Sequence, residues 1–114
     1  MRLDELTTMK CVPCEGGVPK LTAGETAGFL AQVTGWTAAD DRIRKSWAFR
    51  DFLAAMAFLN DVARVAEAEG HHPDFSLHSW NKVDVAIWTH AIGGLSRNDF
   101  ILAAKIDALA PPSP

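Results

Sequence analysis

Apolar residues recur at the interval of an α-helix between Arg50 and Glu69, which is the clearest helical pattern in the chain. Gly70 follows where a left-handed C-terminal cap is expected, and Pro73 prevents the helix from resuming. We therefore predict a helix over 50–69 that ends directly before two adjacent histidines. The residues expected on its apolar face are Phe52, Leu53, Met56, Leu59, Ala63 and Ala66.

Apolar and polar residues alternate in the segments before and after this helix, which predicts β-strands there. Residues 43–49 alternate in this way, and a weaker strand near Trp36 would pair with them through a turn at 40–41. After the helix, residues 83–89 alternate again. Asn81 indicates the turn of a second hairpin, because asparagine tolerates a left-handed backbone. The pattern therefore predicts two hairpins, one before and one after the helix.

Two further helices flank these strands. The first should begin at Thr22, whose side chain can form a capping box with Glu25, and should end before Gly35. The last should begin after Ser96 as N-cap, with Asp99 as its box partner. The predicted order is α-β-β-α-β-β-α. Two hairpins joined by a helix favour an α+β fold, in which a four-stranded antiparallel sheet has three helices packed on one face.

Length and composition restrict the class of protein. With 114 residues the chain should form one domain over 21–110, with an N-terminal extension over 1–20 and a frayed tail over 111–114. Its net charge of -3 provides no basic footprint for nucleic acid. We find no apolar stretch of the length that a signal peptide or a membrane span needs. We therefore expect a cytoplasmic protein that binds neither nucleic acid nor a membrane.

Three histidines can meet at the open end of the second hairpin. If the turn centres on Asn81, His72 and His90 face each other across the strand ladder, because both are equally far from it. His71 is adjacent, and Glu67 lies one helical turn before it. The spacing therefore predicts a cluster of three imidazoles and one carboxylate.

Two kinds of chemistry suit such a cluster. Zinc accepts three histidines and an open position, and imidazole is also the side chain whose pKa best suits proton transfer near neutral pH. Neighbouring residues on a strand point to opposite faces, so His71 and His72 would converge on one ion only where the backbone is irregular. This favours acid/base chemistry. A third interpretation is that His71 and His72 only cap the helix and face water.

The histidines belong to a longer motif. It consists of an acidic residue, three others, His-His-Pro, six others, an aromatic residue, nine others, His, eight others and an acidic residue. This chain has Glu67, His71, His72, Pro73, Trp80, His90 and Asp99 at these positions. The chain from about Leu21 to Ala108 resembles the pterin-4a-carbinolamine dehydratase family in this motif. "NKVDVAIWTH" and "GLSRNDF" are also similar to the family's hairpin and to the start of its third helix.

The resemblance implies that a 4a-hydroxytetrahydropterin loses water to give quinonoid dihydropterin, which recycles the pterin cofactor of aromatic amino acid hydroxylases. An acid would protonate the departing hydroxyl and a base would take a proton from a ring nitrogen, without a metal or redox cofactor. The resemblance makes His71, His72 and His90 the catalytic residues. It gives supporting or substrate-binding positions to Glu67, Pro73, Trp80 and Asp99. The residues by themselves favour a helix cap for Asp99 and hairpin packing for Trp80.

The same resemblance also implies partners and an alternative function. Relatives of this family serve as a dimerisation cofactor of a transcription factor, and others resemble assembly factors of ribulose bisphosphate carboxylase. A chain used only for binding would not need three histidines, so their presence favours the enzyme. An open sheet leaves edge strands with unpaired backbone groups, and the resemblance implies dimers or tetramers. We therefore expect a homodimer or homotetramer that binds a pterin substrate.

Cys11 and Cys14 form a C-x-x-C pair within the N-terminal extension. A structural zinc site usually takes four ligands, and the chain has no second pair of cysteines. The pair does not follow a strand and open a helix, as a thioredoxin-like motif would. A redox-sensitive clip, a metal shared between subunits and a plain surface loop stay open, and the pattern favours the loop.

Overall fold

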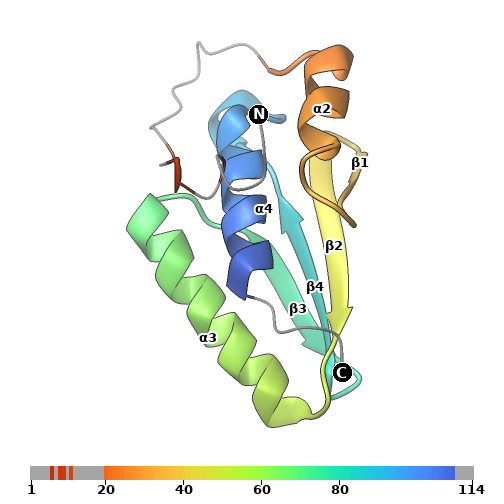
Figure 1. Cartoon of the computed structure of the whole chain (residues 1–114), viewed down its shortest axis with the longest axis vertical. Helices are drawn as coiled ribbons and strands as arrows, with labels where there is room; N and C mark the ends of the chain where they lie inside the picture. The colour runs from red at the N-terminus through yellow and green to blue at the C-terminus, as the bar shows by residue number, and fades with distance from the viewer. Residues whose placement is uncertain (1–5, 7, 10, 12–19, 110–114) are drawn as a thin grey trace.

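The computed structural model describes Leu6, Thr8, Met9, Cys11 and residues 20–109. In this part of the chain, three α-helices pack on one face of a four-stranded antiparallel sheet with strand order β1-β2-β4-β3 (Figure 1). The helices are α2 (Ala23–Leu30), α3 (Phe52–Glu69) and α4 (Arg97–Leu109), the strands are β1 (Thr37–Ala39), β2 (Arg42–Ala48), β3 (Asp74–His78) and β4 (Lys82–Ile87), and a short 3-10 turn, η1, spans His90–Ile92. The predicted α+β fold and the predicted order of elements are confirmed.

The ends of α2 and α3 agree with the sequence patterns. Thr22 accepts a hydrogen bond from the Glu25 backbone, and the Glu25 side chain accepts one from the Thr22 backbone, which completes the capping box. At the end of α3, Gly70 has a left-handed backbone with φ of 64°. The backbone N–H of His71 then donates to the Ala66 carbonyl. This cap ends the helix directly before the two histidines.

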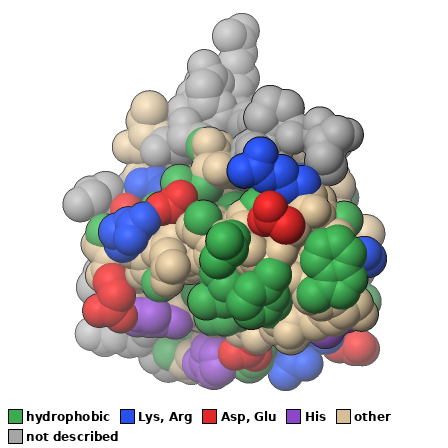
Figure 2. Space-filling model, turned by 90° about the horizontal axis from the view of Figure 1, so that it is seen from below, with side chains coloured by type: hydrophobic (Ala, Val, Ile, Leu, Met, Phe, Trp, Pro, Cys, Tyr) green, Lys and Arg blue, Asp and Glu red, His purple; other side chains and the backbone are tan. Residues whose placement is uncertain are grey.

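The buried face of α3 differs from the predicted face. Its buried residues are Ala55, Phe58, Leu59, Val62 and Ala66. Leu59 and Ala66 are buried as predicted. The other four predicted residues are exposed: Phe52, Leu53, Met56 and Ala63. Hydrophobic side chains gather on the end of the molecule viewed in Figure 2, which is the lower end of Figure 1, where α3 begins and the second hairpin turns. The periodicity was therefore correct for a helix, but packing selected a neighbouring stripe of that helix as its core face.

The turn of the second hairpin was placed one residue too late. Asp74 pairs with Ala86 and His78 pairs with Lys82, so the turn centres on Trp80. Ser79 and Trp80 have the left-handed backbone that the turn requires. Asn81 is buried, and its side-chain amide donates to the Phe49 carbonyl at 2.7 Å. Because this asparagine bonds to the chain that follows β2, it does not form the centre of the turn.

The predicted opposition of His72 and His90 is consequently wrong. Strand β4 ends at Ile87, two residues before the predicted end at 89, and β3 begins only at Asp74. Thr89 forms an isolated bridge with Gly94, and His90 begins η1. His72 and His90 thus lie on irregular segments beyond the ladder. Irregular backbone at both places leaves the two side chains free of the strict alternation of a strand.

The core lies between the sheet and α4. The inner face of the sheet contributes Ile43, Val83, Val85 and Ile87, and α4 contributes Phe100, Ile101, Leu102, Ala103, Ala104 and Ile106. Leu6, from the predicted N-terminal extension, is fully buried in the same cluster. Helix α4 therefore has a fixed position over the sheet, and its first turn is next to the histidines. Among the described residues, no helix is long and apolar enough to cross a membrane.

Candidate active site

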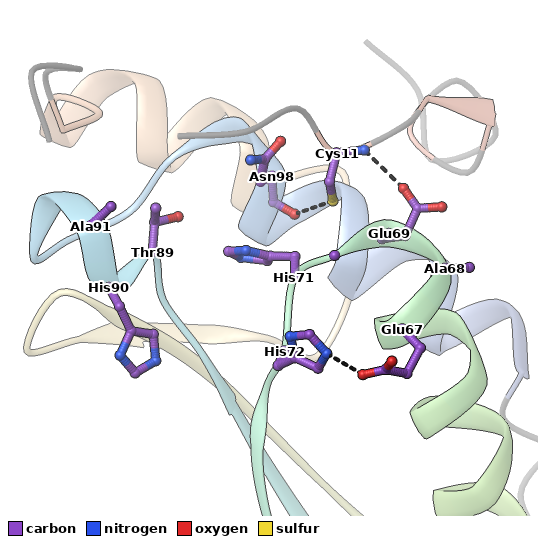
Figure 3. Close-up of a pocket in the computed structure, with 11 residues that line it drawn as sticks. Cys11, Glu67, Ala68, Glu69, His71, His72, Thr89, His90, Ala91 and Asn98 are labelled. Carbon is purple, nitrogen blue, oxygen red and sulfur yellow. Dashed lines mark hydrogen bonds and ion pairs between the residues drawn. The ribbon is translucent and has the colours of Figure 1, made fainter. Parts of the chain in front are cut away.

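A pocket of about 560 Å³ lies where the end of α3, the connection to β3, η1 and the start of α4 meet. It is lined by Cys11, Glu67, Ala68, Glu69, Gly70, His71, His72, Thr89, His90, Ala91 and Asn98. Figure 3 shows His71 and His72 on the connection that follows α3, and His90 on the separate segment that follows β4. The structure thus brings the three predicted histidines to one pocket, although they do not pair across the ladder.

His71 is bound to the buried carboxylate of Asp99. Its Nε2 lies 2.6 Å from Asp99 Oδ1, and the two side chains are 13% and 0% exposed. The other oxygen, Oδ2, accepts hydrogen bonds from the Thr89 hydroxyl at 3.0 Å and the Ser96 backbone N–H at 2.8 Å. Asp99 is therefore both the box partner of α4 and the partner of His71. When the carboxylate accepts a hydrogen bond from Nε2–H of a neutral ring, Nδ1 is left as the acceptor nitrogen.

His72 is paired with Glu67 at the surface. Its Nε2 lies 2.7 Å from Glu67 Oε1, and the side chains are 60% and 80% exposed. Even when His72 is protonated, a pair this exposed contributes little stability, typically about 0–1 kcal/mol. Its effect is to orient the ring at the rim of the pocket. His71 and His72, adjacent in sequence, are thus held by different carboxylates in different surroundings.

His90 has no such polar partner in the described part of the chain. Its ring instead stacks on the indole of Trp88, with ring centroids 4.1 Å apart. His90 is exposed, and both ring nitrogens are available for hydrogen bonds with a ligand. No three His, Cys, Asp or Glu side chains within the described residues are grouped so that they could hold a metal ion.

Cys11 was not expected to contribute to this pocket. Its backbone N–H donates to Glu69 Oε1 at 2.8 Å, and its thiol donates to the Asn98 carbonyl at 3.5 Å. Burial raises the pKa of this thiol from 9.0 to about 12, and the negative charge of Glu69 contributes to the increase. The thiol is therefore protonated at neutral pH and is a poor nucleophile. Half-buried Cys11 is not part of a plain surface loop, whereas Cys14 lies outside the described residues.

A buried ion pair holds Glu69, the residue that binds Cys11 at the edge of the pocket. Glu69 Oε2 lies 2.9 Å from the Nζ of Lys105 on α4, and the side chains are 6% and 17% exposed. Glu69 therefore contacts α4 with one oxygen and the Cys11 backbone with the other. Sequence reasoning missed Glu69, Lys105, Thr89 and Asn98. The only signal for Glu69 is an acidic residue in the last turn of a helix, where it does not complement the helix dipole.

Three residues of the motif do not line the pocket: Asp99, which contacts His71, and also Trp80 and Pro73. Trp80 is 61% exposed in the turn between β3 and β4, at the opposite end of the hairpin. Pro73 is half-buried between His72 and the start of β3, where its ring ends the irregular segment. His78, the fourth histidine, pairs with Lys82 next to that turn and lies 2.9 Å from Asp84. It is thus separated from the other three by the length of β3.

A model of a family described as pterin 4 alpha carbinolamine dehydratase matches residues 19–109. The chain belongs to this family. A putative pterin-4-alpha-carbinolamine dehydratase from Azoarcus is 46% identical over 110 residues, which cover 95% of this chain and 93% of the relative. The family that the histidine motif indicated is confirmed, and this relative is named as a dehydratase.

Solved structures agree with this family. One is described as a transcriptional coactivator/pterin dehydratase from Brucella melitensis; it is 34% identical, with a TM-score of 0.76, and the match covers 82% of this chain and all of that one. A pterin dehydratase-like protein identified as a RuBisCO assembly factor in the alpha-carboxysome is 25% identical, with a TM-score of 0.56 over 68% of this chain and 89% of that one. Both the enzyme and a binding role are therefore represented among proteins of similar fold.

Proposed function

We propose that this protein catalyses the dehydration of 4a-hydroxytetrahydropterin to quinonoid dihydropterin. The observation that carries the proposal is that one pocket contains His71, His72 and His90, with Asp99 and Glu67 bound to two of them. The family of the chain supports the substrate. Proton transfer by positioned imidazoles typically contributes about 10²–10⁴-fold to a rate, which is appropriate for a reaction limited by moving two protons.

The reaction requires one proton to be delivered and one to be removed. An imidazolium donates a proton to the C4a hydroxyl, the carbon–oxygen bond breaks, and water departs. A neutral imidazole takes the proton of a pterin ring nitrogen. The electron pair of the broken N–H bond then forms the new double bond between that nitrogen and C4a. The buried Asp99 carboxylate stabilises the positive charge that develops when His71 accepts a proton. His71 therefore suits the base, and exposed His72 or His90 suits the acid, because water at the rim can restore its proton.

Stopped-flow kinetics with synthetic 4a-hydroxytetrahydropterin would test this function. The rate with wild-type protein should exceed the spontaneous rate, and a double His72→Ala, His90→Ala variant should return close to it. Circular dichroism should show that this variant is folded. A wild-type rate equal to the buffer rate would refute the proposal. We further propose that the protein acts in the cytoplasm and recycles the pterin of an aromatic amino acid hydroxylase.

A second candidate function is a binding or assembly role. The observation in its favour is the group of exposed Phe52, Leu53 and Met56 on α3, which a partner could cover. We propose that a second copy of this chain covers them, because the edge strands β1 and β3 also leave the sheet open to pairing. If binding were the only function, replacing the pocket histidines would leave partner capture unchanged and no dehydration would be measured.

A further inference from the structure

The three histidines of the pocket are positioned in two different ways. His71 and His72 each bond through Nε2 to a carboxylate, at 2.6 Å and 2.7 Å. No described residue bonds to a ring nitrogen of His90. Its imidazole lies over the indole of Trp88 with an interplanar angle of 28° and a centroid separation of 4.1 Å. An aromatic face is thus the contact that orients His90.

Trp88 is itself fixed from its other side. The guanidinium carbon of Arg42 lies 4.0 Å from the centre of the Trp88 ring, a cation–π contact. Arg42 and Trp88 stand one step beyond Ile43 and Ile87, which pair in the β2–β4 ladder. The Arg42 Nε is buried and makes no hydrogen bond within the described residues. Arg42, Trp88 and His90 form a stack that begins on the ordered sheet and ends in the pocket.

Stacking on Trp88 and pairing with a carboxylate leave different numbers of ring nitrogens available to a substrate. A carboxylate engages one ring nitrogen, which leaves only the other for a substrate. Stacking restricts the plane of the ring and leaves both nitrogens available. As an imidazolium, His90 can then donate a hydrogen bond to one group while it transfers a proton to another.

We propose that Trp88 is a positioning residue for His90 and that Arg42 fixes Trp88 in turn. The inference rests on the proposed dehydration, because it assigns Trp88 a role in that reaction. Trp88 touches no reacting atom and acts only through the imidazole. The sequence alone assigned Trp88 to a strand and assigned Arg42 no role.

Substitution of Trp88 separates positioning from simple packing. Trp88→Ala should lower kcat about three- to tenfold, which corresponds to the usual strength of an aromatic pair, and should change KM less than twofold. Trp88→Phe should restore most of kcat, because a smaller ring still stacks. Arg42→Ala should lower kcat about two- to fivefold, the usual range for a partly exposed cation–π contact. Arg44→Ala is the matched control, since Arg44 is exposed on the same strand and contacts the Ala39 carbonyl instead.

A double-mutant cycle tests whether Trp88 acts through His90. In a His90→Ala background, Trp88→Ala should cause no further loss of kcat. An equal loss in both backgrounds would show that Trp88 acts elsewhere and would overturn the inference. Thermal unfolding of each variant, used to select temperatures at which all are folded, excludes loss of the fold as the cause.

Nuclear magnetic resonance tests the stack without any turnover. The ring protons of His90 should resonate upfield of those of exposed His78, because they lie over the indole, and Trp88→Ala should abolish the difference. An unshifted His90 in an active wild-type protein would overturn the inference but leave the dehydratase intact. Wild-type protein without turnover would refute the proposed function and the positioning role with it, even if the stack were present.

Discussion

Asp99 binds His71 with one carboxylate oxygen and the start of helix α4 with the other. The same buried side chain therefore determines where a candidate catalytic ring lies and where a core helix begins. A third donor, the Thr89 hydroxyl, comes from the segment that leads to His90. This single residue thus joins both segments of the pocket to the core.

Asp99→Asn should reduce both activity and stability. An uncharged amide no longer stabilises a positive charge on His71, and we expect kcat to fall on the order of 10²-fold. The amide keeps only one acceptor oxygen, so at least one of the three donors loses its acceptor, and the free energy of unfolding should fall by about 1–3 kcal/mol. Dehydration kinetics and urea unfolding measure the two effects.

Asp107 provides the matched control for Asp99. It lies on the same helix and accepts hydrogen bonds from Trp36 and Lys45, away from the pocket. Asp107→Asn should lower stability by a similar amount while the folded variant retains its turnover. If Asp107→Asn and Asp99→Asn lost activity equally, the effect of Asp99 would be structural only.

His72→Ala and His90→Ala should each lower the rate about 10²–10⁴-fold while the protein stays folded. Both side chains are exposed, so their loss leaves no cavity in the core. His78→Ala is the control, because His78 lies next to the turn at the other end of β3 and should keep a rate close to wild type. A folded His90→Ala variant with unchanged turnover would exclude His90 from the mechanism.

Glu67 and Glu69 should behave in opposite ways, although they are two residues apart on α3. Glu69→Gln breaks a buried pair with Lys105 and should lower the free energy of unfolding by about 1–3 kcal/mol. Glu67→Gln removes an exposed pair and should change stability by less than about 1 kcal/mol, but it should reduce turnover through His72. Denaturant titration together with kinetics distinguishes them. Equal stability losses would contradict the burial of Glu69.

Cys11 should react slowly with iodoacetamide at pH 8 in the folded protein. Its pKa of about 12 leaves almost no thiolate there, whereas the unfolded chain, with the ordinary value of 9.0, has a measurable fraction. The folded state then retains a proton that the unfolded state loses. This contribution to stability is complete below pH 9 and decreases as the pH rises toward about 12.

A Cys14→Ser background isolates the Cys11 measurement. The alkylation rate of the folded protein is compared with that of the same protein in urea, and unfolding is followed between pH 8 and pH 11. Alkylation at equal rates in the two states would contradict the burial of the thiol.

The exposed residues of α3 should mediate self-association. We expect wild-type protein to be a dimer or tetramer by light scattering at micromolar concentration. Leu53→Lys, in the middle of the exposed group Phe52, Leu53 and Met56, should shift it toward smaller species. Ala27→Lys, at an exposed position on α2 away from the start of α3, tests whether charge alone is responsible. A monomeric wild-type protein would contradict the prediction.

Several features of this fold were predictable because they depend on residues close together in the sequence. The end of α3 requires only a helical pattern followed by Gly70, and the start of α2 requires only Thr22 and Glu25. The order of elements follows from such local patterns. The same locality explains why the histidine motif identified the family, since a motif is a spacing along the chain.

Contacts between distant residues decided the rest. The hairpin turn moved from Asn81 to Trp80 because Asn81 bonds to Phe49, 32 residues away. Trp80, although part of the motif, lies at the far end of that hairpin from the pocket.

The pocket shows the same division between local and distant effects. The sequence alone determined which histidines and acids were candidates, and it implied that Asp99 caps a helix. Only the tertiary structure showed that this cap also binds His71, that Cys11 contacts Glu69 across 58 residues, and that His90 rests on Trp88. The physical reason is that a cap or a helical period depends on bonds within a turn or two of chain. Which side chains share a pocket depends instead on how helices and sheet pack, and that packing is selected by the whole core at once.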